Sequence, residues 1–70
     1  MLRAEFRLTP AEIRVANGIA HGASLATIAE RHGIAVATTR SQLKSIFKKT
    51  RTHRQAELVA LLMRAHLAAF

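Results

Sequence analysis

The side chains best suited to chemistry in this chain are cations gathered in one stretch. Seven Lys and Arg residues lie between positions 31 and 54, with no Asp or Glu among them: Arg31, Arg40, Lys44, Lys48, Lys49, Arg51 and Arg54. A basic stretch without compensating acids favours a polyanionic partner, with nucleic acid first and an anionic membrane surface second. A solvated basic face that only aids solubility is the simpler alternative.

Three of these cations, Arg40, Lys44 and Lys48, are spaced by four residues. On a helix this spacing forms one row, called the basic row below, about 130° round from the apolar positions. Those positions are Thr39, Leu43, Ile46 and Phe47. Cations and small serines on one helix face suit the major groove of duplex DNA. The predicted base contacts are Arg40, Ser41, Lys44 and Ser45, and Lys48, Lys49 and Arg51 are placed for phosphates.

The other reactive side chains form no recognisable catalytic or metal-binding set. His21, His32, His53 and His66 are 11, 21 and 13 residues apart, and the chain has no Cys. No pair has the helical spacing of metal ligands. The serines have no His/Asp constellation to activate them, and the glycines form no phosphate-binding loop. We expect no enzymatic activity, no metal and no cofactor.

Composition restricts the chain to one small domain. It has 70 residues, a net charge of +7 and three aromatic residues, all Phe. No segment approaches the ~18–20 apolar residues of a membrane span, and the N-terminus lacks the apolar run of a signal peptide. We expect a cytoplasmic protein with a lead-in or linker remnant at 1–7, a domain at 8–66 and a tail at 67–70.

Local signals predict four helices, so the expected fold is an all-α, four-helix bundle-like domain. Thr9, Pro10 and Glu12 form a capping box with a proline start, and Gly22 ends the first helix. Ser24 caps a short second helix that stops at Gly33, where a positive φ makes a tight turn. The third helix runs from about Val36 to about Lys49. Ser24–Lys49 therefore reads as a helix-turn-helix, without a wing.

The last helix is expected from about His53 to about His66, with two adjacent apolar stripes. One has the spacing of a core face: Leu58, Leu61, Leu62 and Ala65. The other consists of Val59, Met63 and Leu67. A lone surface helix needs only one stripe, so the second is either a broader core contact or a self-association surface.

The same residues carry a resemblance to a known family. LTPAEIRV (8–15), AHG (20–22), LATIA (25–29), TTR (38–40), IFKK (46–49) and RQAELV (54–59) resemble the LuxR-type, GerE-like DNA-binding domain of bacterial transcription regulators. The resemblance covers about residues 8–66. It implies a four-helix domain behind a receiver or ligand-sensing domain, with Thr38, Lys48 and the second-helix start up to Thr27 on phosphates. It also implies homodimers paired through the last helix.

The chain departs from that family at several positions. Leu25-Ala26-Thr27 stands where Asn-Lys-Glu is common, and Ala35 replaces the usual Ser cap of the third helix. Loss of that cap costs about 1 kcal/mol if no other group compensates. Arg51 stands where Gly is usual, so the turn before the last helix is made without glycine.

Three other functions fit the sequence less closely. A protein-interaction module could dock through the last helix, but it would not need the basic row. A sigma-factor promoter-reading domain also uses a helix-turn-helix. A membrane-surface helix would combine a basic face with a strongly apolar one. The expected function is sequence-specific binding of double-stranded DNA in transcription regulation.

Overall fold

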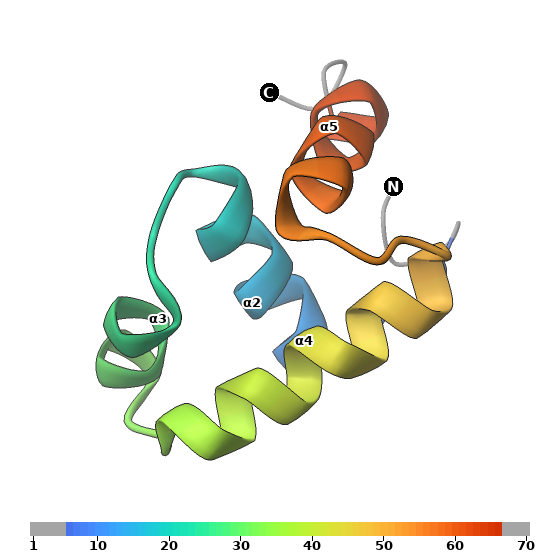
Figure 1. Cartoon of the computed structure of the whole chain (residues 1–70). Helices are drawn as coiled ribbons and strands as arrows, with labels where there is room; N and C mark the ends of the chain where they lie inside the picture. The colour runs from blue at the N-terminus through green and yellow to red at the C-terminus, as the bar shows by residue number, and fades with distance from the viewer. Residues whose placement is uncertain (1–5, 67–70) are drawn as a thin grey trace.

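The computed structural model describes residues 6–66, and of residues 65 and 66 only the backbone. This range contains four helices and no strand: α2 (Pro10–Ala20), α3 (Leu25–His32), α4 (Val36–Thr50) and α5 (Gln55–His66) (Figure 1). The predicted all-α, four-helix fold is confirmed. No helix in this part of the chain is long and apolar enough to cross a membrane.

The N-terminus of α2 has the predicted capping box. Thr9 Oγ1 accepts from the backbone N–H of Glu12 at 3.1 Å, and the Thr9 N–H donates to Glu12 Oε1 at 2.8 Å. Pro10 occupies the first turn of α2, where backbone N–H groups have no intrahelical acceptor, so the N–H that proline lacks costs the helix no hydrogen bond. Two backbone donors that the helix leaves unpaired are thereby satisfied, which fixes where α2 begins.

Helices α2, α3 and α4 all end in the same way, on a left-handed residue. Gly22, Gly33 and Arg51 have φ of 84°, 64° and 56°. In each case the next residue donates its N–H back to a carbonyl five positions earlier, as in Ala23 to Gly18, Ile34 to Ala29 and Thr52 to Phe47. This is the Schellman closure, in which a positive φ lets the chain reverse while capping the last carbonyls. The helix ends at Gly22 and Gly33 were predicted from the sequence. At the end of α4 the left-handed residue is Arg51 in place of a glycine.

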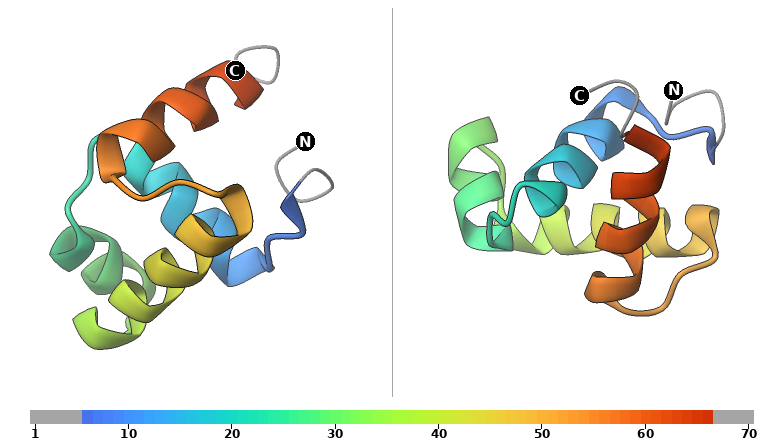
Figure 2. Two further views of the ribbon diagram at one scale, coloured as in Figure 1. Left: turned by 45° about the vertical axis from the view of Figure 1, so that its right-hand side comes forward. Right: turned by 90° about the horizontal axis from the view of Figure 1, so that it is seen from above.

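Helix α2 lies at the centre of the domain and contacts α3, α4 and α5 (Figure 2). Its Val15, Ala16 and Ile19 are almost fully buried, and they meet Ile28, Leu43, Ile46, Leu58 and Leu62 in one apolar cluster. Gly18 explains how α3 approaches so closely. A Cβ built there would lie 2.6 Å from Ile28 Cγ1, so only glycine leaves room for that side chain.

The helix-turn-helix consists of α3, the Gly33 turn and α4, which packs against both α2 and α3. Helix α4 ends at Thr50 and α5 begins at Gln55, within two residues of the boundaries predicted at about Lys49 and near His53. Just before α5, the His53 N–H donates to Glu57 Oε1 at 2.6 Å, so an acidic side chain of the first turn accepts from the backbone that precedes the helix. That bond holds the pKa of Glu57 below its ordinary value.

Candidate nucleic-acid interface

Helix α4, which carries the basic row, forms one edge of the molecule (Figures 1 and 2). Arg40, Lys44 and Lys48 are all exposed, as is Ser41 between them. Among the described residues no carboxylate pairs with any cation of the row. Three uncompensated charges one helical turn apart extend over about 12 Å, at 1.5 Å per residue.

The opposite side of α4 fixes the orientation of the row. Thr39 is fully buried and its hydroxyl donates to the Ala35 carbonyl at 3.2 Å. Leu43 and Ile46 enter the apolar core. At the far end the Thr50 hydroxyl donates to the Ile46 carbonyl at 2.7 Å, and its oxygen lies 2.9 Å from that of Thr52. Apolar contacts and satisfied threonine hydroxyls together hold α4 at a defined rotation.

Lys49 differs from the basic row because it is already paired. Its Nζ lies 2.7 Å from Glu12 Oε1 and donates to the Arg7 carbonyl at 3.2 Å. Burial raises the pKa of Glu12, but hydrogen bonds from Lys49, Ser45 and the Thr9 N–H outweigh that effect and lower it to about 2. The pair joins the N-terminus of α2 to the last turn of α4. It neutralises a charge that the sequence presents as part of an uncompensated block.

Ser45 also belongs to this contact. It is half-buried, and its side chain helps to lower the pKa of the Glu12 carboxylate. Its predicted role in base contact stays a prediction. The structure thus divides the predicted α4 residues. Arg40, Ser41, Lys44 and Lys48 lie in the open, while Ser45 and Lys49 are tied to Glu12.

The predicted phosphate contacts outside the row are also exposed: Thr27, Thr38 and Arg51. Thr27 lies in the first turn of α3, where its N–H donates to Ser24 Oγ at 3.1 Å. The Ser24 hydroxyl in turn donates to Thr27 Oγ1. Thr38 makes no cap for α4, whose N-cap residue is Ala35 and which has no side-chain cap hydrogen bond. The predicted loss of that cap is therefore confirmed, and the first N–H groups of α4 have no side-chain partner from the cap residue.

One residue at this face was missed in the sequence. Val36 is 39% exposed, at the first position of α4 and one turn before Arg40. Because it is four residues from Arg40, it extends the basic row with an apolar group. The same spacing of four was the signal that could have found it, and its apolar character concealed it.

The predicted self-association stripe on α5 is partly used by the domain itself. Val59 is half-buried and packs against the core, whereas Met63 is 39% exposed. Leu67 lies outside the described residues. Leu58 and Leu62 of the neighbouring stripe are fully buried. Met63 is therefore the described member of the stripe that leaves a large apolar side chain at the surface.

The histidines whose side chains are described lie apart from any acidic cluster. Within residues 6–66, no group of three His, Cys, Asp or Glu side chains is placed to hold a metal ion. His21 Nδ1 lies 2.7 Å from the Asn17 carbonyl, and His53 is exposed beside the start of α5.

Comparisons with known proteins give no information about the function of this chain. No protein-family model, no curated protein and no solved structure matches this chain significantly.

Proposed function

We propose that this domain binds double-stranded DNA in a sequence-specific manner, as part of a cytoplasmic transcription regulator without catalytic activity. The observation that carries the proposal is the basic row, which is exposed and unpaired on a helix whose rotation the core fixes. In a helix-turn-helix the second helix enters the major groove and its N-terminal part reads base edges. Here that helix is α4.

The contacts divide by their position along α4. Arg40 and Lys44 lie in its second and third turns, where they can donate to guanine O6 and N7. Ser41 allows close approach between them. Val36 is suited to a thymine methyl group, which is the apolar feature of the major groove. Lys48 lies nearer the helix end and is suited to phosphate oxygens, together with Thr27, Thr38 and Arg51.

Two copies would pair through α5. Met63 is an exposed apolar residue beside the half-buried Val59, and burying both against a second copy removes apolar surface from water. Such a dimer would read two half-sites about one helical turn apart. A sensing or receiver domain elsewhere in the protein would supply the input signal.

The test is a salt-dependent DNA titration with matched variants. Lys48→Gln should weaken binding to all duplexes and reduce the slope of log K against log salt by about 0.9. Arg40→Gln should cost about 1–3 kcal/mol and relax the base preference found by site selection. Arg14→Gln is the control, because it removes an equal charge from an exposed position on α2. If Arg14→Gln matches Lys48→Gln in both affinity and slope, the basic row is not the DNA-binding face.

Backbone amide shifts provide a second readout that does not depend on mutants. A short mixed-sequence duplex at low salt should move amides of residues 36–49, and the shifts should fade at about 0.2 M salt, where screening is stronger. Shifts confined to α5 would instead support a protein-interaction module that docks through Met63, and would end the DNA proposal.

A further inference from the structure

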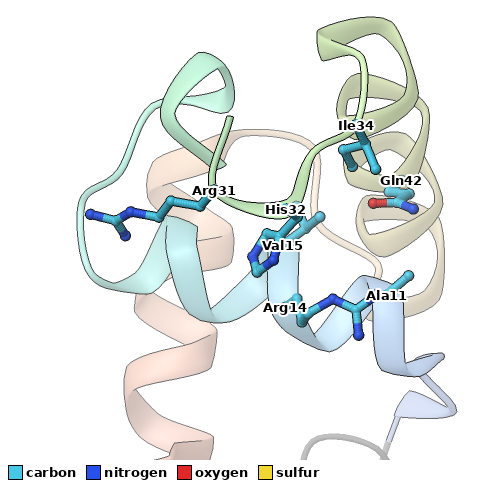
Figure 3. A pocket seen from close by; sticks show the side chains of 7 residues that line it. All are labelled: Ala11, Arg14, Val15, Arg31, His32, Ile34 and Gln42. Atoms are coloured by element: carbon cyan, nitrogen blue, oxygen red, sulfur yellow. The ribbon is translucent and has the colours of Figure 1, made fainter. Parts of the chain in front are cut away.

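A cleft between α2 and the end of α3 is lined by two arginines and a histidine that the DNA interface does not use. It consists of two hollows of about 370 and 410 Å³, and both are lined by Arg14, Arg31 and His32. Gln42 and Ile34 complete the first hollow, and Asn17 and Ile28 contribute to the second. In Figure 3, Arg14 and His32 lie between Gln42 on one side and Arg31 on the other.

The charges of this cleft are not compensated. Neither hollow is lined by an Asp or Glu, and in the described part of the chain no carboxylate pairs with Arg14, Arg31 or His32. All three side chains are exposed and come from two different helices. Guanidinium groups suit carboxylate or phosphate oxygens, which they bind with two parallel hydrogen bonds.

Each hollow is also lined by a side-chain amide whose oxygen accepts no hydrogen bond. Gln42 Oε1 and Asn17 Oδ1 are buried without a hydrogen-bond partner. Buried acceptors are almost always satisfied in folded proteins, so an unsatisfied pair beside one cleft calls for an explanation. Rotation about the terminal torsion, which is broad for amides, can turn each oxygen toward a donor in the cleft. A ligand that carries N–H or O–H groups as well as negative charge would satisfy these acceptors.

The length of the cleft favours a peptide over a single anion as its ligand. Its lining on α2 runs from Ala11 to His21, which is about 15 Å at 1.5 Å per residue. An extended peptide rises about 3.3 Å per residue, so about four or five residues fit along it. Such a segment presents a backbone N–H at every residue and points alternate side chains the same way. Apolar surface from Val15, Ile34 and Ile28 lies between the cations.

We propose that this cleft binds an extended acidic peptide segment of a partner protein. Arg14 and Arg31 would contact its carboxylates, and Gln42 and Asn17 would accept from its backbone. Gln42 is two residues from both Arg40 and Lys44, and two residues turn a helix by about 200°. Gln42 therefore lies on the side of α4 opposite the basic row. The proposal does not depend on DNA binding.

The experiment is an amide-shift titration of the full chain with a capped peptide of alternating Glu and Ala. A Gln/Ala peptide of the same length and inorganic phosphate serve as parallel probes. The Glu peptide should saturate shifts at Arg14, Val15, His32 and Ile34, and the Gln peptide should not. Arg14→Gln should weaken the peptide about fivefold, as expected for one exposed charge-assisted contact. The matched variant Arg40→Gln should change its affinity by less than about twofold.

Three results would overturn the proposal. The shifts could follow α4 and disappear in Arg40→Gln, which would mean that the peptide only mimics the polyanion at the basic row. Inorganic phosphate could saturate the same amides as tightly as the peptide, which would indicate a small-anion site. The shifts at the cleft could also fail to saturate. Because Arg14 is exposed and outside the core, its Gln variant should remain folded, and Arg31→Gln provides an independent second variant.

Discussion

Arg51 gives the sharpest test of the structure, because stability and DNA binding should respond to its replacement in opposite directions. It closes α4 with φ 56° and ψ 40°, the conformation that Gly22 and Gly33 supply at the ends of α2 and α3. A left-handed residue with a Cβ costs roughly 1–2 kcal/mol relative to glycine. The greater freedom of glycine in the unfolded chain returns about 0.5–1 kcal/mol of this. Arg51→Gly should therefore stabilise the domain by about 0.5–1 kcal/mol.

For a domain of this size that gain corresponds to a rise in Tm of about 2–8 °C. The chain has no Trp or Tyr, so unfolding is best followed by far-UV circular dichroism, with urea midpoints compared at constant slope. Arg51→Ala is the matched control, because it removes the same charge but keeps the Cβ and the strain. We expect its Tm to stay close to that of the parent.

The same two variants should lose DNA affinity together. One phosphate contact releases about 0.9 counterions, which corresponds to a roughly five- to tenfold loss of affinity near 0.1 M salt. Anisotropy titrations of a labelled duplex across salt concentrations measure both the loss and the slope. The strain argument fails if Gly is no more stable than Ala at position 51. The phosphate assignment fails if Ala binds DNA as tightly as Arg, and a loss in Gly alone would trace the effect to backbone flexibility.

Three further predictions concern the core, the ion pair and the α5 surface. Gly18→Ala should destabilise the domain by about 1–2 kcal/mol in urea denaturation, because the added Cβ meets Ile28 and this outweighs the better helix propensity of alanine. The double variant with Ile28→Ala should lose less stability than the sum of the two single variants. The pKa of Glu12 is about 2 in the folded state against 4.5 for the unperturbed group. Stability from this carboxylate is complete above about pH 4.5 and is lost as pH falls toward 2. Acid titrations should show about 1–2 kcal/mol lost in that window, and Glu12→Gln should remove this component. Met63→Glu should shift a dimer to monomer in sedimentation equilibrium and leave the Tm of the monomer unchanged, whereas an unchanged sedimentation profile would exclude pairing through this residue.

The helix boundaries were predictable where a short segment determines them. Thr9 and Glu12 are three residues apart, so their reciprocal capping is visible in the sequence and confirmed in the structure. Gly22 and Gly33 mark two helix ends by residue type alone. The start of α5, at Gln55, lies two residues after the predicted position near His53, because no capping residue type marks it in the sequence.

Contacts between distant segments were not predictable from spacing. Gly18 looked like a cost within α2, and only the packing of α3 shows that Ile28 requires it. Lys49 looked like one more cation of an uncompensated block, yet its partner lies 37 residues away. A charge count along the chain treats Lys48 and Lys49 alike, whereas the fold exposes one and pairs the other. No local pattern contains that difference.

Glu12 connects the predictable and the unpredictable parts of the fold. One carboxylate oxygen accepts from the Thr9 N–H, which starts α2, and from Lys49 Nζ, which lies in the last turn of α4. Local capping fixes where the carboxylate is, and the carboxylate then fixes the end of α4 against α2. The core sets the rotation of α4 through Thr39, Leu43 and Ile46, and this pair restrains its far end. A side chain that appears to serve only a helix terminus therefore also restrains the helix that presents the basic row.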